Sequence, residues 1–346
     1  MSLPSVSVII PAHNHELFVE ETLRSVFRQE YQNIELIVID DGSIDNTLQI
    51  INKVKANSGH RFNRFVVCGQ KNSGITATLN SLLSQVRGDY VQFCASDDFL
   101  EPSIVRIFAS FLANNPDYNF VVGDNYFVDE GSCRVAWNSC GQVVPLGTPR
   151  SYATFCQFLQ KINQHADFKT NAFGTYASLL LGNYIPNGFM IRTSALTEIG
   201  GFKKEAPLED WYLVMQIAKL GKLKYLDECL YNYRSHATNT IKKHGIMDKY
   251  FIDTLKYEIA LVAQSKDEKM IELAEAAVTK NKKILSMCSY ILVYFRKRID
   301  KYYLCILVNK HDYVVEITRF ISAKKIFAIK RFLKFFWFKI AIFTSK

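Results

Sequence analysis

Short apolar segments alternate with amphipathic segments over the first part of the chain. The apolar segments are rich in β-branched residues and lack a polar face, which is typical of strands buried on both sides. They cover residues 5–10, 34–39, 64–68 and 90–94. Apolar positions at helical spacing predict helices over residues 15–29, 45–57, 75–85 and 103–114. This alternation predicts an α/β, Rossmann-like fold with a mostly parallel central sheet and helices on both faces.

The pattern becomes less regular after residue 114. We expect a strand over 120–124, short strands and turns over 126–147, and mostly helix over 151–182. A strand over 185–192 and a helix from Pro207 to about Leu220 follow. Apolar periodicity then predicts helices over 246–296.

Polar motifs follow three of the predicted strands at the point where each strand ends. They are Pro11-Ala12-His13-Asn14, Asp40-Asp41 and Asp97-Asp98. In open α/β sheets ligands bind at the carboxyl edge of the strands, so three motifs at one edge favour a single site. Adjacent carboxylates repel each other, and a nearby cation best explains them, although a solvated turn is the simpler alternative.

Neither of the common glycine-rich phosphate-binding motifs occurs in the chain. A nucleotide at this edge would therefore be held by side chains. Its phosphates would be neutralised by a metal ion on the carboxylates. Mg²⁺ and Mn²⁺ suit oxygen ligands and bridge substrate phosphates.

The formal net charge of +9 is concentrated at one end of the chain. Residues 280–346 contain 16 Lys and Arg against 3 Asp and Glu, whereas residues 1–279 contain 26 against 30. Within the tail, residues 321–346, basic and aromatic positions fall largely on opposite sides of a helix. Such a helix is expected to lie in an anionic membrane surface, or else to pack on the rest of the protein. No nucleic-acid-binding module accompanies the basic tail, so we expect no nucleic-acid partner.

Composition narrows the class of protein. The 49% apolar and 22% charged residues are values of a globular protein. We find no signal peptide and no apolar run long enough to span a membrane. The eight cysteines are scattered without a Cys-x-x-Cys pair, which favours reduced thiols over zinc or disulfides. We expect a cytoplasmic protein, associated peripherally with the inner face of the plasma membrane.

Several motifs resemble family 2 glycosyltransferases, which have the GT-A fold. The resemblance covers about residues 4–240, and its motifs occur in the family's order. They are Val6–Pro11 with Asn14, Ser25 and Gln29; Asp40-Asp41-Gly42-Ser43 with Asp45; Lys71-Asn72-Ser73-Gly74; Arg87-Gly88-Asp89-Tyr90 leading to Ser96-Asp97-Asp98; Ile199-Gly200-Gly201-Phe202; Glu209-Asp210-Trp211; and Tyr233-Arg234-Ser235-His236.

The resemblance implies a metal-dependent, inverting glycosyltransferase of bacterial polysaccharide, O-antigen or capsule synthesis. Its donor would be a nucleotide-diphosphate sugar, a UDP-hexose or UDP-N-acetylhexosamine, and its acceptor a glycan or lipid-linked hydroxyl. The donor site implied by matching positions comprises Pro11, His13, Asn14, Asp40, Asp41, Lys71, Asn72 and Asp97. The cation, Mn²⁺ or Mg²⁺, is expected on Asp98 and Asp97, with His236 as a third ligand or phosphate contact. Asp210 is the expected general base.

Alternatives remain for some of these residues. His13 and His236 could occupy solvated loops, and Trp211 could belong to the core rather than to a sugar site. Arg192 and Arg234 are better interpreted as structural ion-pair partners than as catalytic residues.

Ala95 departs from the family's Asp-x-Asp-Asp pattern because it removes the first carboxylate. This leaves open which Asp binds the metal directly; we favour Asp98, with Asp97 on the ribose or behind the metal. With fewer protein ligands, the metal is expected to bind weakly until donor phosphates complete its shell.

The predicted domains are a GT-A catalytic domain over 1–240 and a helical C-terminal region over 241–346, which ends in the basic tail. The catalytic domain is divided into a donor half, about 1–100, and an acceptor half, about 101–240. A catalytically silent nucleotide-sugar-binding subunit of a glycan assembly complex is the alternative function. A nucleotidyltransferase fits less well, because the first predicted strand is not followed by a basic, glycine-rich loop.

Overall fold

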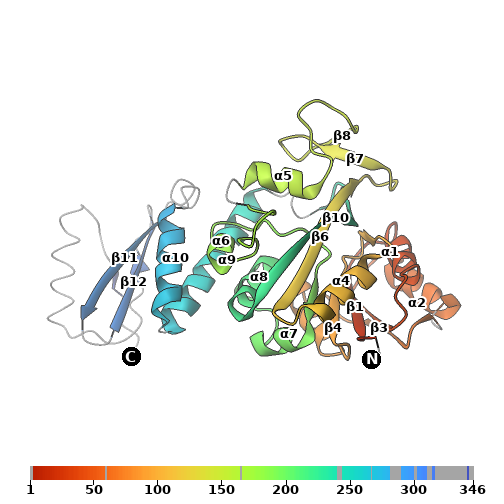
Figure 1. Ribbon diagram of the computed structural model, residues 1–346, viewed down its shortest axis with the longest axis horizontal. Coiled ribbons are helices and arrows are strands. Elements are labelled where there is room, and N and C mark those ends of the chain that lie inside the picture. Colours follow the sequence, from red (N-terminus) through yellow and green to blue (C-terminus); the bar gives the residue numbers. More distant parts are fainter. Residues whose placement is uncertain are drawn as a thin grey trace. The chain divides into compact units, whose positions relative to one another are not determined.

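The chain forms two compact units, Met1–Tyr257 and Glu258–Lys346. Figure 1 shows their elements in a computed structural model. The structure describes residues 3–58, 61–163, 166–239, 244–265, 267–280, 290–299, 302–309, 314–315 and 341–342. The predicted domain boundary at residue 240, like the division into donor and acceptor halves, stays a prediction.

Strands and helices alternate through the first unit. Its strands are β1 (Val6–Ala12), β2 (Ile34–Asp40), β3 (Arg64–Gly69), β4 (Tyr90–Phe93), β5 (Phe99–Leu100), β6 (Tyr118–Val128), β7 (Arg134–Trp137), β8 (Val143–Val144), β9 (Met190–Arg192) and β10 (Lys222–Arg234). Its helices are α1 (Val19–Phe27), α2 (Thr47–Ser58), α3 (Ile75–Leu83), α4 (Ile104–Asn114), α5 (Phe155–Ile162), α6 (Tyr176–Leu179), α7 (Thr193–Ile199) and α8 (Glu209–Leu220). Helix α9 (His244–Ser265) begins in this unit and ends in the second.

The central sheet has the strand order β3-β2-β1-β4-β9-β6-β10-β5, with β7 and β8 attached to β6. Strands β3, β2, β1 and β4 are all parallel to their neighbours. Strand β9 pairs antiparallel with both β4 and β6, while β6 and β10 run parallel again. The predicted α/β fold with a mostly parallel central sheet is therefore confirmed.

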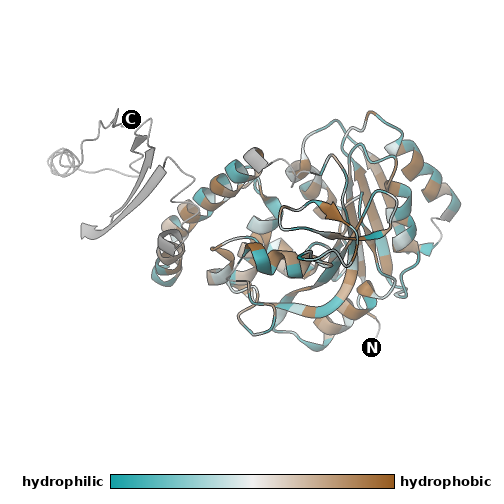
Figure 2. Ribbon diagram, turned by 90° about the horizontal axis from the view of Figure 1, so that it is seen from above, coloured by the Kyte–Doolittle hydropathy of each residue, from teal (hydrophilic) through white to brown (hydrophobic). Residues whose placement is uncertain are grey.

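The core lies on both faces of the parallel strands because successive side chains of a strand point to opposite sides. Alternate residues of β1, such as Val8 and Ile10, pack with the apolar faces of α1, α2 and α4. Helix α3 packs against the same strands and contributes Leu79 and Leu82 to the buried set. Figure 2 shows the hydrophobic colours concentrated in the strands of this sheet. Burial on both faces explains why these strands are mostly apolar; polar side chains within them, such as Ser7, Glu35 and Gln92, are themselves buried.

Two predictions about the middle of the chain were wrong. Residues 151–182 contain only the short helices α5 and α6, and the 13-residue strand β10 was not predicted. Between these two helices, aromatic side chains pack from a loop; the rings of Phe168 and Phe173, for example, lie 5.6 Å apart.

In the second unit, the described residues form helix α10 (Glu268–Lys280) and strands β11 (Tyr290–Ile299) and β12 (Tyr302–Asn309), which pair antiparallel. Helix was predicted up to residue 296. The run from Tyr290 to Phe295 is instead a strand, as its β-branched and aromatic residues favour. The basic tail lies outside the described residues, except that Ala341–Ile342 form β14, parallel to β13 (Val314–Val315). None of the described helices is both long and apolar enough to cross a membrane.

Candidate active site

The three strand-end motifs meet at one edge of the sheet. Strand β1 is in register with β2 and with β4, so the carboxyl ends of the three strands lie together. Side chains connect the loops that follow. His13 Nδ1 lies 3.0 Å from the Asp41 carbonyl oxygen, and His15 Nδ1 lies 2.8 Å from the Ser96 hydroxyl. The predicted common edge is confirmed.

The loop after β2 is shaped by its own polar groups. Asp40 accepts hydrogen bonds from the backbone N–H and the hydroxyl of Ser43. Gly42 has a φ of +71°, and a Cβ atom there would lie 2.6 Å from the backbone nitrogen of Asn72. Only glycine allows the two loops to approach this closely. Asp40 therefore shapes this loop, and its predicted part in the donor site stays a prediction.

The carboxylate of Asp41 links the loop after β2 to the start of α3 through hydrogen bonds. Its Oδ1 accepts from Gln70 and from the backbone of Ser73, and its Oδ2 accepts from the backbone of Gly74 at 2.9 Å. Burial raises the pKa of Asp41, but these hydrogen bonds outweigh burial and hold the pKa below its ordinary value. Asp41 is thus a fixed negative charge beside the β1 loop.

Four of the predicted donor-site residues lie at or near the solvent-exposed surface beside Asp41. His13, Asn14, Lys71 and Asn72 are exposed. Asn14 adopts a left-handed backbone conformation, with a φ of 54°, and its side-chain oxygen accepts from the backbone of Ile44 at 2.9 Å. Together with half-buried Pro11, these residues form a polar rim that one bound molecule could contact.

Asp97 faces two imidazole rings. Its Oδ2 lies 2.8 Å from Nε2 of His236 and 3.9 Å from Nε2 of His15. Burial raises the pKa of Asp97, but the hydrogen bond from His236 and the charge interaction with His15 outweigh it, so the pKa is lowered. Burial lowers the pKa of His15, which keeps this ring neutral near pH 7. One carboxylate and two imidazoles therefore converge, and oxygen and imidazole donors of this kind suit a divalent cation.

Asp98 is engaged differently from its neighbour. Its Oδ2 accepts from the hydroxyl of Tyr231 and its Oδ1 from the backbone N–H of Arg234, both at 2.8 Å. Burial and the neighbouring charge of Asp97 raise the pKa of Asp98 well above its ordinary value. Both oxygens already have protein partners. The geometry thus favours Asp97 over Asp98 as a metal ligand, the reverse of the order expected from the sequence.

Arg234 holds the loop that carries Asp97 and Asp98, and only 1% of Arg234 is exposed. Its Nε donates to the Asp97 carbonyl oxygen, and its Nη2 donates to Glu21 of α1 at 2.6 Å. Its Nη1 donates to the Ser132 hydroxyl at 2.9 Å. These contacts support the interpretation of Arg234 as a structural ion-pair partner.

Glu209 and Asp210 open helix α8 as predicted. Asp210 Oδ1 accepts from the backbone of Trp211, and its Oδ2 accepts from the side chain of Asn183 at 3.3 Å. Burial raises the pKa of Asp210; burial and the charge of Asp210 together raise the pKa of Glu209 to about 8. Trp211 itself is fully buried and stacks on Phe251, so it belongs to the core, the alternative interpretation from the sequence.

The two acidic motifs are linked by strand β10. Burial is the main cause of the raised pKa of Tyr233 on this strand, and the negative charges of Asp98, Asp97 and Asp210 raise it further. Helix α8, which begins with Glu209 and Asp210, also packs against β10, the strand whose Tyr231 and Arg234 hold Asp98. A single region of the molecule therefore holds the carboxylate–imidazole cluster and the half-buried carboxylate of α8.

Three residues of this region were missed by sequence reasoning: His15, Tyr231 and Asn183. His15 directly follows a predicted motif, which was the only local sign of its role. Tyr231 and Asn183 act on carboxylates that lie far away in the sequence. No local pattern marks such partners.

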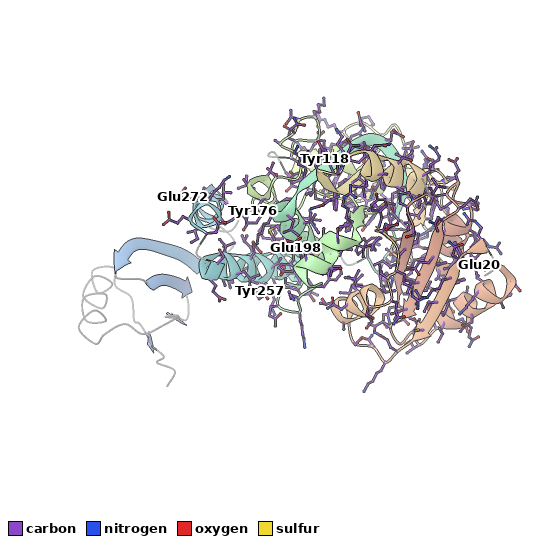
Figure 3. The ribbon with its side chains drawn as sticks, turned by 60° about the horizontal axis from the view of Figure 1, so that its bottom comes forward. Glu20, Tyr118, Tyr176, Glu198, Tyr257 and Glu272 are labelled. Carbon is purple, nitrogen blue, oxygen red and sulfur yellow. The ribbon has the colours of Figure 1, made fainter. Side chains whose placement is uncertain are left out.

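A cavity of about 330 Å³ lies at the opposite end of β6 and β10. Tyr118 and Tyr176, both labelled in Figure 3, are among its lining residues, together with Leu223 and Tyr225. Tyr118 and Leu223 stand at the beginnings of β6 and β10, whereas Arg234 stands at the end of β10. This cavity is separate from the carboxylate–imidazole cluster.

Solved structures with a similar fold share a common class of ligand. The chain is similar to S. aureus TarS 1–349 in complex with UDP-GlcNAc, with a TM-score of 0.59 and 19% identity, over 82% of this chain and 75% of that one. It is also similar to the mannosyltransferase PcManGT from Pyrobaculum calidifontis in complex with GDP-Man and Mn²⁺, with a TM-score of 0.54 and 14% identity, over 83% and 80% of the two chains. These matches confirm the predicted GT-A fold.

Sequence comparison leads to the same family. The chain is 27% identical over 248 residues to a hyaluronan synthase of Pasteurella multocida, covering 71% of this chain but only 22% of that enzyme. It thus spans less than a quarter of the length of that relative. The family model for glycosyl transferase family 2 matches residues 7–180, about half of the chain. The chain therefore belongs to glycosyl transferase family 2.

Proposed function

We propose that the chain transfers a sugar, with inversion, from a nucleotide-diphosphate sugar to an acceptor hydroxyl. The observation that supports this most is that Asp97 converges with the imidazoles of His15 and His236, with ligand atoms within 4.8 Å of one another, while a second carboxylate, Asp210, opens helix α8. One carboxylate sits with imidazoles that suit a cation, and the other is half-buried with a raised pKa. Inverting transfer needs both: charge neutralisation at the leaving diphosphate and a base at the acceptor.

The donor side of the site would be the polar rim. Its members would be Pro11 near the end of β1, His13 and Asn14 in the loop after β1, and Lys71 and Asn72 in the loop before α3. His13 joins this rim to Asp41, because its Nδ1 lies 3.0 Å from the Asp41 carbonyl oxygen and its Nε2 lies 3.4 Å from Nδ2 of Asn72. Asp41, which stays ionised, would accept hydrogen bonds from the nucleoside. Lys71, which is exposed, would meet a phosphate of the donor.

A divalent cation fits the donor set of Asp97 and His236. Mn²⁺ or Mg²⁺ held there would neutralise negative charge on the diphosphate as it leaves. Asp98 would not bind the ion but would fix the loop through Tyr231 and Arg234.

Asp210 would act as the general base. Its raised pKa brings its basicity closer to that of the acceptor, and Asn183 orients its Oδ2. In the reaction the acceptor oxygen forms a bond to the anomeric carbon, the bond from that carbon to the phosphate oxygen breaks, and the acceptor proton passes to Asp210. The nucleoside diphosphate leaves with the bonding electron pair.

We further propose a UDP-sugar donor and an acceptor in cell-surface polysaccharide synthesis. TarS binds UDP-GlcNAc and the Pasteurella relative is named for hyaluronan synthesis, which supports this choice. The acceptor would be a glycan or a lipid-linked oligosaccharide.

The test is release of the nucleoside diphosphate from a panel of UDP-sugars and GDP-mannose, with Mn²⁺ and with Mg²⁺. We expect one donor to be turned over, and D210N to lose turnover by at least about 100-fold while still binding UDP in calorimetry. D117N provides the matched control, because Asp117 is an exposed partner of Lys222 away from the site. Donor binding without any turnover would instead favour the catalytically silent subunit.

We also propose that the basic tail attaches the protein to the inner face of the plasma membrane. Its seven Lys and Arg, without an acidic residue, support this. Substituting Lys330, Arg331 and Lys334 by Glu in the full chain should abolish sedimentation with phosphatidylserine vesicles. Unchanged sedimentation would contradict the proposal.

A further inference from the structure

We propose that His15 is a third protein ligand of the cation, completing a site of two imidazoles and one carboxylate with Asp97 and His236. The inference rests on the proposed function only in that the site takes a divalent metal. It predicts that the protein binds Mn²⁺ or Co²⁺ before any nucleotide is present. From the sequence alone, weak binding without nucleotide was expected.

The distances agree with a shared ion. One potential ligand atom each from His15, Asp97 and His236 lies within 4.8 Å of the other two. Two ligands about 2.1 Å from one metal lie roughly 3 Å apart when adjacent and roughly 4 Å apart when opposite. The 2.8 Å and 3.9 Å separations from Asp97 Oδ2 to the two imidazoles lie close to these values. Small side-chain adjustments would bring all three atoms to one ion.

The unused ring nitrogens are already oriented. Nδ1 of His15 lies 2.8 Å from the Ser96 hydroxyl, and Nδ1 of His236 lies 2.8 Å from the Thr238 hydroxyl. A hydrogen bond at Nδ1 leaves Nε2 of each ring to face Asp97. Metal-binding histidines are commonly held in this way by a partner on the second nitrogen.

The rings are also held by packing. The His15 backbone N–H donates to the Thr47 hydroxyl at 2.8 Å, which fixes the turn before α1. Phe18 contacts both rings, with centroids 6.2 Å from His15 and 5.1 Å from His236. The side chains of His15 and Asp97 remain 22% and 15% exposed, so one side of the cluster is open to further ligands such as donor phosphate.

His15 thereby replaces the carboxylate that Ala95 lacks, and the replacement changes the metal preference. Imidazole ligands favour later transition metals, whereas Mg²⁺ prefers oxygen ligands. We expect affinity without nucleotide to rise in the order Mg²⁺, Mn²⁺, Co²⁺. Mg²⁺ would bind well only when phosphate oxygens join the shell.

The test is calorimetric titration of the full chain with MnCl₂ in the absence of nucleotide, combined with pulsed electron paramagnetic resonance of the bound Mn²⁺. We expect ¹⁴N couplings from two histidines in the wild-type protein and from one in H15Q. The affinity of H15Q should fall at least about tenfold. D117N is the control, because Asp117 is an exposed partner of Lys222 that lies before the start of β6, away from the cluster; its affinity and both couplings should stay unchanged.

A second variant keeps the test independent of misfolding. H15C should bind Co²⁺ with a new thiolate-to-metal absorption band in the near ultraviolet, which a merely structural position cannot produce. The proposal is overturned if wild-type protein binds no Mn²⁺ without nucleotide, if H15Q keeps both couplings, or if H15C gives no such band. None of these results bears on UDP release by the wild-type protein, so the proposed transferase could stand while the role of His15 falls.

Discussion

Nε2 of His236 lies 2.8 Å from Oδ2 of Asp97, although 139 residues separate them in the sequence. The contact joins the end of β10 to the loop after β4. It places the imidazole of one loop against the acidic motif of the other. The proposed cation site depends on this pairing.

We therefore predict that H236Q lowers turnover of the donor by at least about 100-fold, because one of the few protein ligands of the metal is lost. Turnover is measured as UDP release at saturating Mn²⁺. T238V is the graded control: it removes only the hydroxyl beside Nδ1 of His236 and should cost about tenfold. Equal turnover in H236Q and the wild-type protein would exclude His236 from the site.

A second prediction concerns the hydroxyl that holds Asp98. Tyr231 donates to Asp98 Oδ2 at 2.8 Å and accepts from the backbone N–H of Ala95 at 3.1 Å. Y231F leaves both buried groups without this partner, so the free energy of unfolding should fall by about 1–3 kcal/mol in urea denaturation. Y31F is the control, since the Tyr31 hydroxyl donates to the part-buried carbonyl of Pro4 and its loss should cost less. Equal losses would argue against Asp98 as a structural anchor.

A third prediction separates backbone strain from steric conflict. Gly188 has a φ of +76°, and a Cβ there would lie 2.1 Å from the ring of Tyr231. Gly74 has a φ of +85°, but a Cβ there would meet no atom within 4 Å. Each alanine variant carries about 1–3 kcal/mol of backbone strain, and G188A adds the cost of displacing the ring, about 1–3 kcal/mol more.

Urea denaturation of G188A and G74A measures the difference directly. G188A should also weaken Mn²⁺-dependent turnover, because Tyr231 positions the loop that carries Asp97 and Asp98. If G74A were destabilised as much as G188A, the ring contact would have no role in stability.

The part of the fold that sequence predicted best is the part with continuous apolar strands. Strands β1, β2 and β4 are almost entirely buried, and β3, at the edge of the sheet, is half-buried but keeps an apolar run, so a local pattern identifies all four. Strand β10 was not predicted because Lys222, Lys224 and the Asp227–Glu228 pair interrupt its apolar pattern. In addition, β-bulges shift its register between Tyr225 and Tyr231. Tertiary pairing with β6, rather than local propensity, makes this segment a strand.

In the candidate site, too, features with a local sequence pattern were predicted, and those that depend on tertiary contacts were not. The acidic motifs were visible as runs at strand ends, and their common edge follows from parallel pairing. The choice between Asp97 and Asp98 was not predictable. It depends on Tyr231 and Arg234, which engage Asp98 from a strand that sequence reasoning did not recognise. His15 was equally hidden, because its role requires the loop after β4 to fold back on it.

The last prediction concerns pH and the pair that opens α8. The pKa of Glu209 is raised from 4.5 to about 8 by burial and by the charge of Asp210. Between these two values the folded protein holds a proton that the unfolded chain has released. The free energy of unfolding should therefore fall as pH rises from about 5 to about 8 and level off above that. E209Q removes this contribution, so its stability should depend less on pH and exceed that of the wild-type protein near pH 8 by about 1 kcal/mol or more.

Urea denaturation at about pH 5, 6.5 and 8 measures this slope. Burial also raises the pKa of Asp210, so Asp210 makes the free energy of unfolding fall with pH in the same direction. This part of the pH dependence should persist in E209Q and disappear in the double variant E209Q/D210N. E205Q serves as control, since it removes an exposed carboxylate in the turn before α8 without changing a half-buried position. Only a group whose pKa differs between the folded and unfolded states can make stability depend on pH. If the free energy of unfolding changed with pH equally in E209Q and E205Q, burial of the Glu209 carboxylate would therefore not be unfavourable to its charge.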